Sequence, residues 1–215
     1  MAPRRTIVTL RACAAALLLI LPVPAAGQPA PSGVGPEVSV TAGVLAPLAE
    51  LTRNPGSFST EVSSAVGVSA SLGYWLGSGL GVAANGVWAP AELNVQQSAF
   101  TGPIPNDLGE ADFLAGTLTL MYRIRSGGAA SIVEPFFGLG AGVRHLSVDP
   151  IAAPEVENAT DPAATVVAGA VTRLGSGLAL RLEVRDLVSR YASPLDGESR
   201  VQNDVVVGVG LSFRP

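Results

Sequence analysis

Two short motifs carry side chains whose types and spacing could do chemistry. In the first, His145, the only histidine of the 215-residue chain, precedes Ser147 by two residues. Residues i and i+2 of an extended strand share a face, so an imidazole base could lie beside a hydroxyl nucleophile. The alternative is an amphipathic ring at the mouth of a strand, with no catalytic role. We favour this alternative.

The second motif is "LALRLEVRD", residues 178–186, in which Arg181, Glu183 and Arg185 recur every second residue. In a strand these three side chains lie on one face, opposite a run of large apolar residues. Buried charges persist only when they are paired and hydrogen-bonded. The motif therefore predicts either a path for protons or solutes or a structural plug of ion pairs, and we favour the plug.

Composition limits the class of protein. Hydrophobic residues make up 48% of the chain and charged residues only 14%, with a mean hydropathy of +0.42. The one cysteine, Cys13, lies in the apolar N-terminal segment, so we expect no disulfide in the processed protein. We also expect no metal site and no cofactor, because no Cys, His and Asp spacing suits one.

The N-terminal segment has the three parts of a secretory signal peptide. Residues 1–11 carry a positive charge from three arginines, and the run after them is apolar. The segment "PVPAAGQ" then offers small residues for cleavage after Gly27. We expect residues 1–27 to be removed and residues 28–36 to form a linker. The only charged side chains in the signal peptide are arginines, so its removal makes the remaining chain more acidic. An acidic exported chain is a poor nucleic-acid binder.

The remaining chain alternates between large apolar and small or polar residues in about eight segments. In the last segment Val207, Val209, Leu211 and Phe213 alternate with glycine and serine. Such alternation is typical of strands with two different surroundings. We expect strands within residues 37–46, 61–75, 80–89, 111–123, 134–145, 164–174, 178–188 and 205–213.

The connections between these segments alternate between long and short, and two of the short ones read "GSG", at 77–79 and 175–177. Strands of about ten residues joined by alternating short turns and long loops are typical of membrane β-barrels. The last strand must pair with the first, because an open edge in lipid leaves backbone groups without partners. The sequence therefore predicts an all-β fold: a closed antiparallel up-and-down transmembrane β-barrel over residues 37–215.

Eight strands enclose a space that side chains just fill, so we expect no wide pore. The alternation predicts a polar, lumen-facing set that includes the β-strand motif described above. Its members are Glu134, Arg144, Arg181, Glu183, Arg185 and Asp204.

Three segments of the chain resemble the small outer-membrane β-barrel family of the OmpA/OmpX type. They are "EPFFGLGAGVR" (134–144), "LALRLEVRD" (178–186) and "VGVGLSF" (207–213), and the resemblance covers nearly all of residues 37–215. It implies an integral protein of the bacterial outer membrane, exported through a Sec-type signal. Its implied role is non-enzymatic: envelope structure, adhesion or minor solute passage.

The resemblance also implies partners. They are outer-membrane lipid and the barrel-assembly machinery, which reads a C-terminal strand ending in an aromatic residue; the protein itself is expected to be a monomer. Here that residue is Phe213, followed by Arg214 and Pro215.

Two other functions stay open. The His145 and Ser147 pair resembles that of the lipid A deacylases, which would make the protein a barrel hydrolase acting on outer-leaflet lipid. Against this, Val148 follows the serine where those enzymes usually have Asn. The other alternative is a soluble, secreted, lipocalin-like β protein, whose large apolar side chains would point inward.

Overall fold

β-Strands form nearly all of the structure, a computed structural model that describes residues 33–48, 52–54, 58–97, 109–124, 133–150, 158–192 and 199–215. The expected signal peptide and most of the expected linker lie outside these residues. The strands are β1 (Val34–Pro47), β2 (Thr52–Asn54), β3 (Phe58–Val62), β4 (Ala65–Leu76), β5 (Leu80–Gln97), β6 (Gly109–Arg123), β7 (Val133–Pro150), β8 (Ala159–Arg173), β9 (Leu178–Ala192) and β10 (Ser199–Phe213). The first strand thus begins three residues before the expected boundary at residue 37.

The described residues contain no helix long and apolar enough to cross a membrane.

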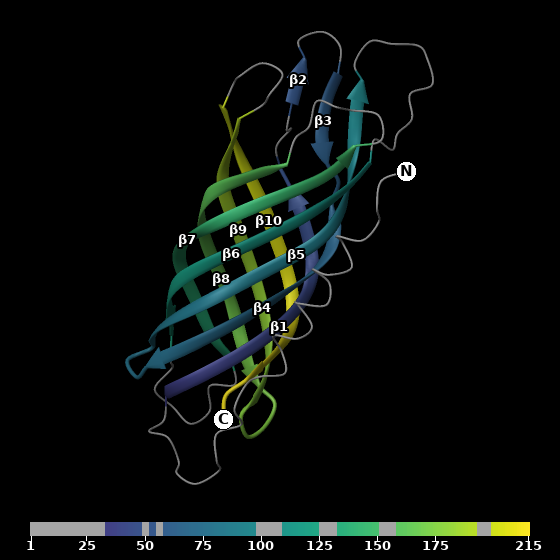
Figure 1. Cartoon of the computed structure of the whole chain (residues 1–215). Helices are drawn as coiled ribbons and strands as arrows, with labels where there is room; N and C mark the ends of the chain where they lie inside the picture. The colour runs from purple at the N-terminus through teal and green to yellow at the C-terminus, as the bar shows by residue number, and fades with distance from the viewer. Residues whose placement is uncertain are drawn as a thin grey trace.

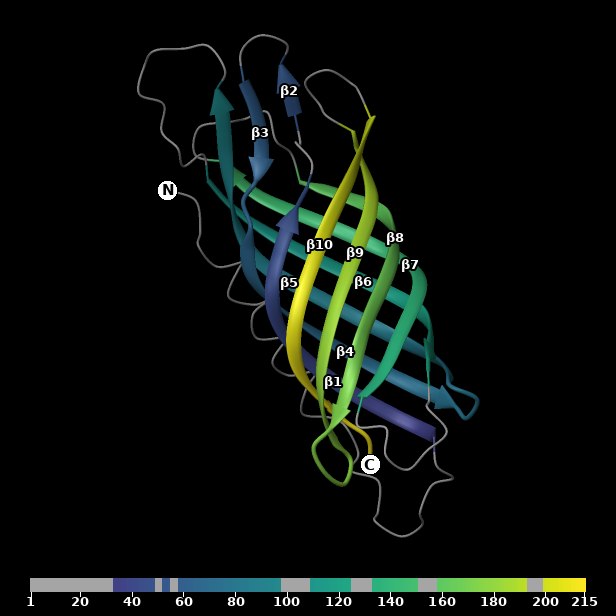
Figure 2. The ribbon, with the colours of Figure 1, turned by 180° about the vertical axis from the view of Figure 1, so that it is seen from behind.

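Eight strands close into an antiparallel barrel in the order β1–β4–β5–β6–β7–β8–β9–β10 (Figures 1 and 2). Strand β5 pairs with β6 from Leu80 opposite Tyr122 to Glu92 opposite Glu110, and β10 pairs with β1 from Val38 opposite Phe213 to Pro47 opposite Asp204. Closure pairs the first strand with the last, so the barrel region has no open edge. The predicted closed barrel of eight strands is confirmed.

The alternation along the strands sorts the side chains between two surroundings. On β10, Val207, Val209, Leu211 and Phe213 are about half exposed, whereas Gly208 and Ser212 between them are buried. The same holds around the barrel, whose outer wall carries the exposed large apolar residues. The lipocalin-like alternative required these side chains to point inward, and they point outward.

The long connection between the first two expected strands, residues 47–60, contains a short antiparallel pair of strands. Strands β2 and β3 stand beyond the barrel at the end of the long connections, where β3 pairs with the last residues of β5 (Figure 1). We call this end the long-loop end. The opposite end, which holds the β4–β5 and β8–β9 turns and the C-terminus, is the short-turn end.

A bulge between β3 and β4 corrects one predicted face. Val62 pairs with Leu93 and Val68 with Trp88, so six steps on one strand oppose five on β5. One extra residue reverses the alternation. Val62 is therefore buried in the lumen and Val66 is 72% exposed, although uninterrupted alternation through the expected strand at 61–75 would put both on one face.

Inward-facing glycines allow the wall to curve. A Cβ placed on Gly210 would strike the backbone of β1, and one on Gly142 would strike the backbone of β6. These positions lie in the β10–β1 and β6–β7 pairings, which are opposite each other in the strand order. Small residues at these pairings leave room for longer side chains from the other strands.

Candidate functional site

Strand β9 supplies the centre of an ionic cluster inside the barrel. Glu183 accepts a hydrogen bond from Arg181 Nε at 2.8 Å on one oxygen and from Arg185 Nη2 at 3.1 Å on the other. All three side chains are at most 4% exposed. The period-two spacing puts them on the inner face of β9, and the pairing compensates each charge at close range.

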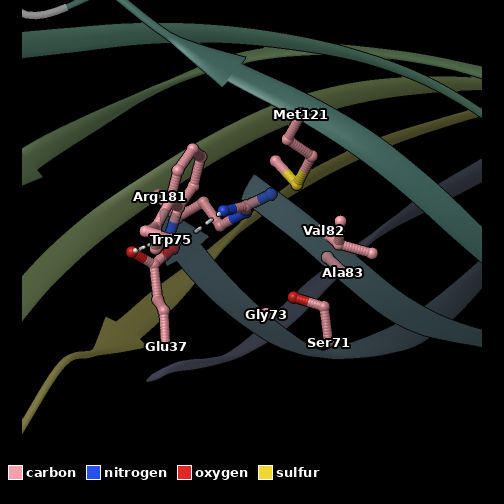
Figure 3. Close-up of a pocket in the computed structure, with 8 residues that line it drawn as sticks. All are labelled: Glu37, Ser71, Gly73, Trp75, Val82, Ala83, Met121 and Arg181. Atoms are coloured by element: carbon pink, nitrogen blue, oxygen red, sulfur yellow. Dashed lines mark hydrogen bonds and ion pairs between the residues drawn. The ribbon is translucent and has the colours of Figure 1, made fainter. Parts of the chain in front are cut away.

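Glu37 on β1 is a second centre. Arg123 of β6 donates to its two carboxylate oxygens at 2.9 and 2.8 Å, and Arg214, just after β10, donates at 2.9 Å. Arg181 Nη1 lies 3.4 Å away, and the indole of Trp75 on β4 donates at 3.1 Å. One carboxylate therefore connects β1, β4, β6, β9 and the residue that follows β10 across the lumen. Figure 3 shows Glu37 with two of these partners, Trp75 and Arg181.

Glu134 on β7 extends this network toward β8. Its carboxylate lies 3.6 Å from Arg123 Nη1 and forms a short ion pair with Arg173. The six buried members of the network alternate in charge and balance as three acids and three arginines. We call these six the ionic cluster: Glu37, Arg123, Glu134, Arg181, Glu183 and Arg185.

Aromatic rings and amides complete the coordination of the buried guanidinium groups. The Arg123 guanidinium lies 4.1 Å from the Trp75 ring centroid, and that of Arg181 lies 4.1 Å from the Phe136 centroid. Arg185 Nη2 also donates to Asn85 Oδ1 at 3.1 Å. Stacking on a ring face and a neutral acceptor both stabilise a desolvated cation.

Little space remains beside the cluster. A cavity of about 10 Å³ lies between Glu37, Ser71, Trp75, Met121 and Arg181 (Figure 3). That volume holds about one water molecule. The arrangement at this level fills the lumen with charged and aromatic side chains.

The predicted lumen-facing residues fall into two groups. Glu134, Arg181, Glu183 and Arg185 belong to the ionic cluster in the short-turn half. Arg144 and Asp204 form a separate pair in the long-loop half, with Arg144 Nε 2.7 Å from Asp204 Oδ2. Asp161 joins this pair at 3.5 Å from Arg144 Nη1.

Sequence reasoning missed several members of the network. Glu37 and Arg123 stand on the polar faces of their segments, and that parity was a usable signal. Their pairing was not visible because they lie 86 residues apart. Arg214 follows the terminal aromatic residue and was not among the predicted lumen-facing residues, yet it turns inward and binds Glu37.

The His145 and Ser147 pair lies on the outer wall. Both residues share the parity of the exposed Leu139 and Val143 on β7. His145 Nδ1 forms its hydrogen bond, at 2.7 Å, with Thr160 Oγ1 of β8. The contact therefore links two strands on the outside of the barrel, away from the ionic cluster.

Across the described ranges, no group of three or more His, Cys, Asp or Glu side chains could hold a metal ion.

With this geometry in view, the sequence can be compared with known proteins. Residues 12–213 match the family model described as the outer membrane protein beta-barrel domain. The chain belongs to this family. Membership supports a location in the bacterial outer membrane and a general role as an outer-membrane barrel. A comparison with curated proteins gave no match.

Solved structures agree with the fold. OprG from Pseudomonas aeruginosa matches with a TM-score of 0.59 and 16% identity, over 85% of this chain and 97% of that one. Neisserial surface protein A matches with 0.52 and 12%, over 86% and 100%. AlkL matches with 0.52 and 18%, over 90% and 95%. At these identities the likeness shows a shared fold.

Proposed function

We propose that this protein is a non-enzymatic integral barrel of the outer membrane whose lumen is closed by the ionic cluster. Its role then belongs to the wall and the outer loops, as an element of envelope structure or adhesion, with at most minor solute passage. The observation that carries this proposal is the chain of ion pairs that spans the lumen from β9 to β1, β6 and β7.

Two physical points support closure. Each buried acid of the cluster contacts at least two arginines, so opening a passage would separate charges that are out of contact with bulk water. Above the cluster, the long-loop half contains a packed apolar core that includes Leu45, Phe113 and Leu187. Water and ions have no favourable path past such a core.

The proposal includes partners. Lipid would surround the exposed apolar residues of the outer wall, and the assembly machinery would read β10 at Phe213. The proposed protein acts as a monomer, without nucleic acid or a cofactor, after cleavage of its signal peptide. The hydrolase alternative is not preferred, because the imidazole of His145 pairs with Thr160 of the next strand.

Solute flux into liposomes tests the proposal. We expect wild-type protein to give no faster swelling in small sugars than empty liposomes. Glu183→Ala is expected to lower the free energy of unfolding without a large gain in sugar flux. Glu110→Ala, at an exposed acid near the long-loop end of β6, is the matched control. Rapid swelling with wild-type protein would refute closure.

A further inference from the structure

The ion pairs at the short-turn end form an open chain rather than a ring. Arg173 binds Glu134, Glu134 also binds Arg123, and Arg123 shares Glu37 with Arg214. This series of ion pairs alternates in charge around the short-turn mouth of the barrel, from β8 through β7, β6 and β1 to the end of β10. Both of its ends are arginines.

Only β9 separates these two ends. Arg173 pairs in register with Ala179 of β9, and Ala179 pairs with Ser212, two residues before Arg214. Gly177 lies in the turn two residues before Ala179, and its carbonyl accepts the backbone N–H of Arg214. The β9 segment between the two arginines therefore presents a methyl group and a glycine, with no carboxylate to close the ring.

The charge count points the same way. The buried ionic cluster is balanced, and the two terminal arginines are the surplus. They are also the accessible ones, since the side chain of Arg173 is 65% exposed and that of Arg214 is 22% exposed. The buried Nε of Arg214 has no hydrogen-bond acceptor among the described residues. An anion would complete the alternation.

We propose that the short-turn mouth is an oxyanion-binding site in which Arg173 and Arg214 clamp a phosphate group across Ala179. Strands two apart in a sheet are about 10 Å from each other, a span that two arginine side chains cover with a phosphate between them. The planar guanidinium fork matches phosphate oxygens in a bidentate manner. Glu134 binds Arg173 from the β7 side and Glu37 binds Arg214 from the β1 side, so the two ion pairs flank the gap at β9.

Titration with inorganic phosphate tests the site, in maltoside micelles at constant ionic strength and followed by calorimetry. We expect saturable binding to wild-type protein. Arg173→Ala and Arg214→Ala should each weaken it at least tenfold. Arg190→Ala, at an exposed arginine near the other end of β9, should leave it unchanged. Absence of saturable wild-type binding, or equal binding by Arg173→Ala, would overturn the proposal.

A second variant keeps every arginine. Ala179→Asp puts a carboxylate into the gap, where it closes the ring from within. We expect this variant to lose phosphate binding and to unfold at a higher urea concentration than the wild type. Undiminished phosphate binding by Ala179→Asp would overturn the proposal even if the arginine variants failed to fold.

The same titration in phospholipid nanodiscs identifies the source of the phosphate. Unchanged affinity there would show that the site takes dissolved oxyanions. A tenfold weaker affinity would show that lipid headgroups compete for it. Both results support the clamp, provided that Arg173→Ala weakens phosphate binding in nanodiscs as it does in micelles. Phosphate binding in nanodiscs that does not depend on Arg173 would contradict it.

Discussion

The two halves of the lumen are filled by different means. The short-turn half contains the ionic cluster, whose members are held by ion pairs within β9 and between strands and pack beside a smaller apolar cluster around Trp75 and Phe136. The long-loop half contains two apolar clusters, around Leu93 and Leu146 and around Phe113 and Leu187, with Arg144 and Asp204 as a buried ion pair. In an apolar core, the free-energy cost of truncating a side chain grows with the volume removed. In an ionic network, even one lost partner is costly, because it leaves a desolvated charge behind.

The largest expected effect comes from breaking the ionic half. Glu183→Ala leaves Arg181 and Arg185 without their shared carboxylate and should lower the free energy of unfolding by about 3–5 kcal/mol. Urea unfolding in detergent micelles measures this. Replacing all three residues together by leucine or methionine removes the charges as well as the pairing, so the triple variant should be more stable than the single one. A triple variant as unstable as Glu183→Ala would contradict the comparison.

The apolar half should respond in a graded manner. Leu187 is fully buried in its cluster, and Leu187→Ala should cost about 2–5 kcal/mol, whereas the smaller change Leu187→Val should cost less. The same unfolding measurement in micelles applies. Equal losses for the two substitutions would show that this half does not behave as a packed core.

The outer wall offers a comparison of opposite faces on one strand. Val207→Arg places a charge among exposed apolar residues of β10 and should cost about 2–4 kcal/mol, with impaired insertion into vesicles. Gly208→Ser points into the lumen, where an added Cβ meets Thr41 at 3.3 Å, and should be milder. Similar losses for both variants would mean that the two faces are wrongly assigned.

The smallest effect is expected at the rim. The Arg173 side chain is 65% exposed, so its ion pair with Glu134 is screened by water and salt. Arg173→Ala should therefore change the free energy of unfolding by less than about 1 kcal/mol. A loss comparable to that of Glu183→Ala would show that the buried and exposed parts of the network act as one unit.

How far the sequence predicts this molecule depends on how local each feature is. The face of Leu182 or Val209 follows from its parity within one strand, so the eight strands and the polar face of β9 could be predicted. The partners of Glu37 could not, because Arg214 is 177 residues away and the two meet only when the barrel closes. The bulge that turns Val62 inward is likewise set by the pairing of β3 with β5, which single-strand alternation does not contain.

Single-channel recording of the wild-type protein in planar bilayers tests the closed lumen most directly. With the ionic cluster intact below a packed apolar core, we predict no steady unit currents in potassium chloride. Steady, sizeable currents that Glu183→Ala abolishes or makes indifferent to the cation would show instead that the cluster lines a conducting route.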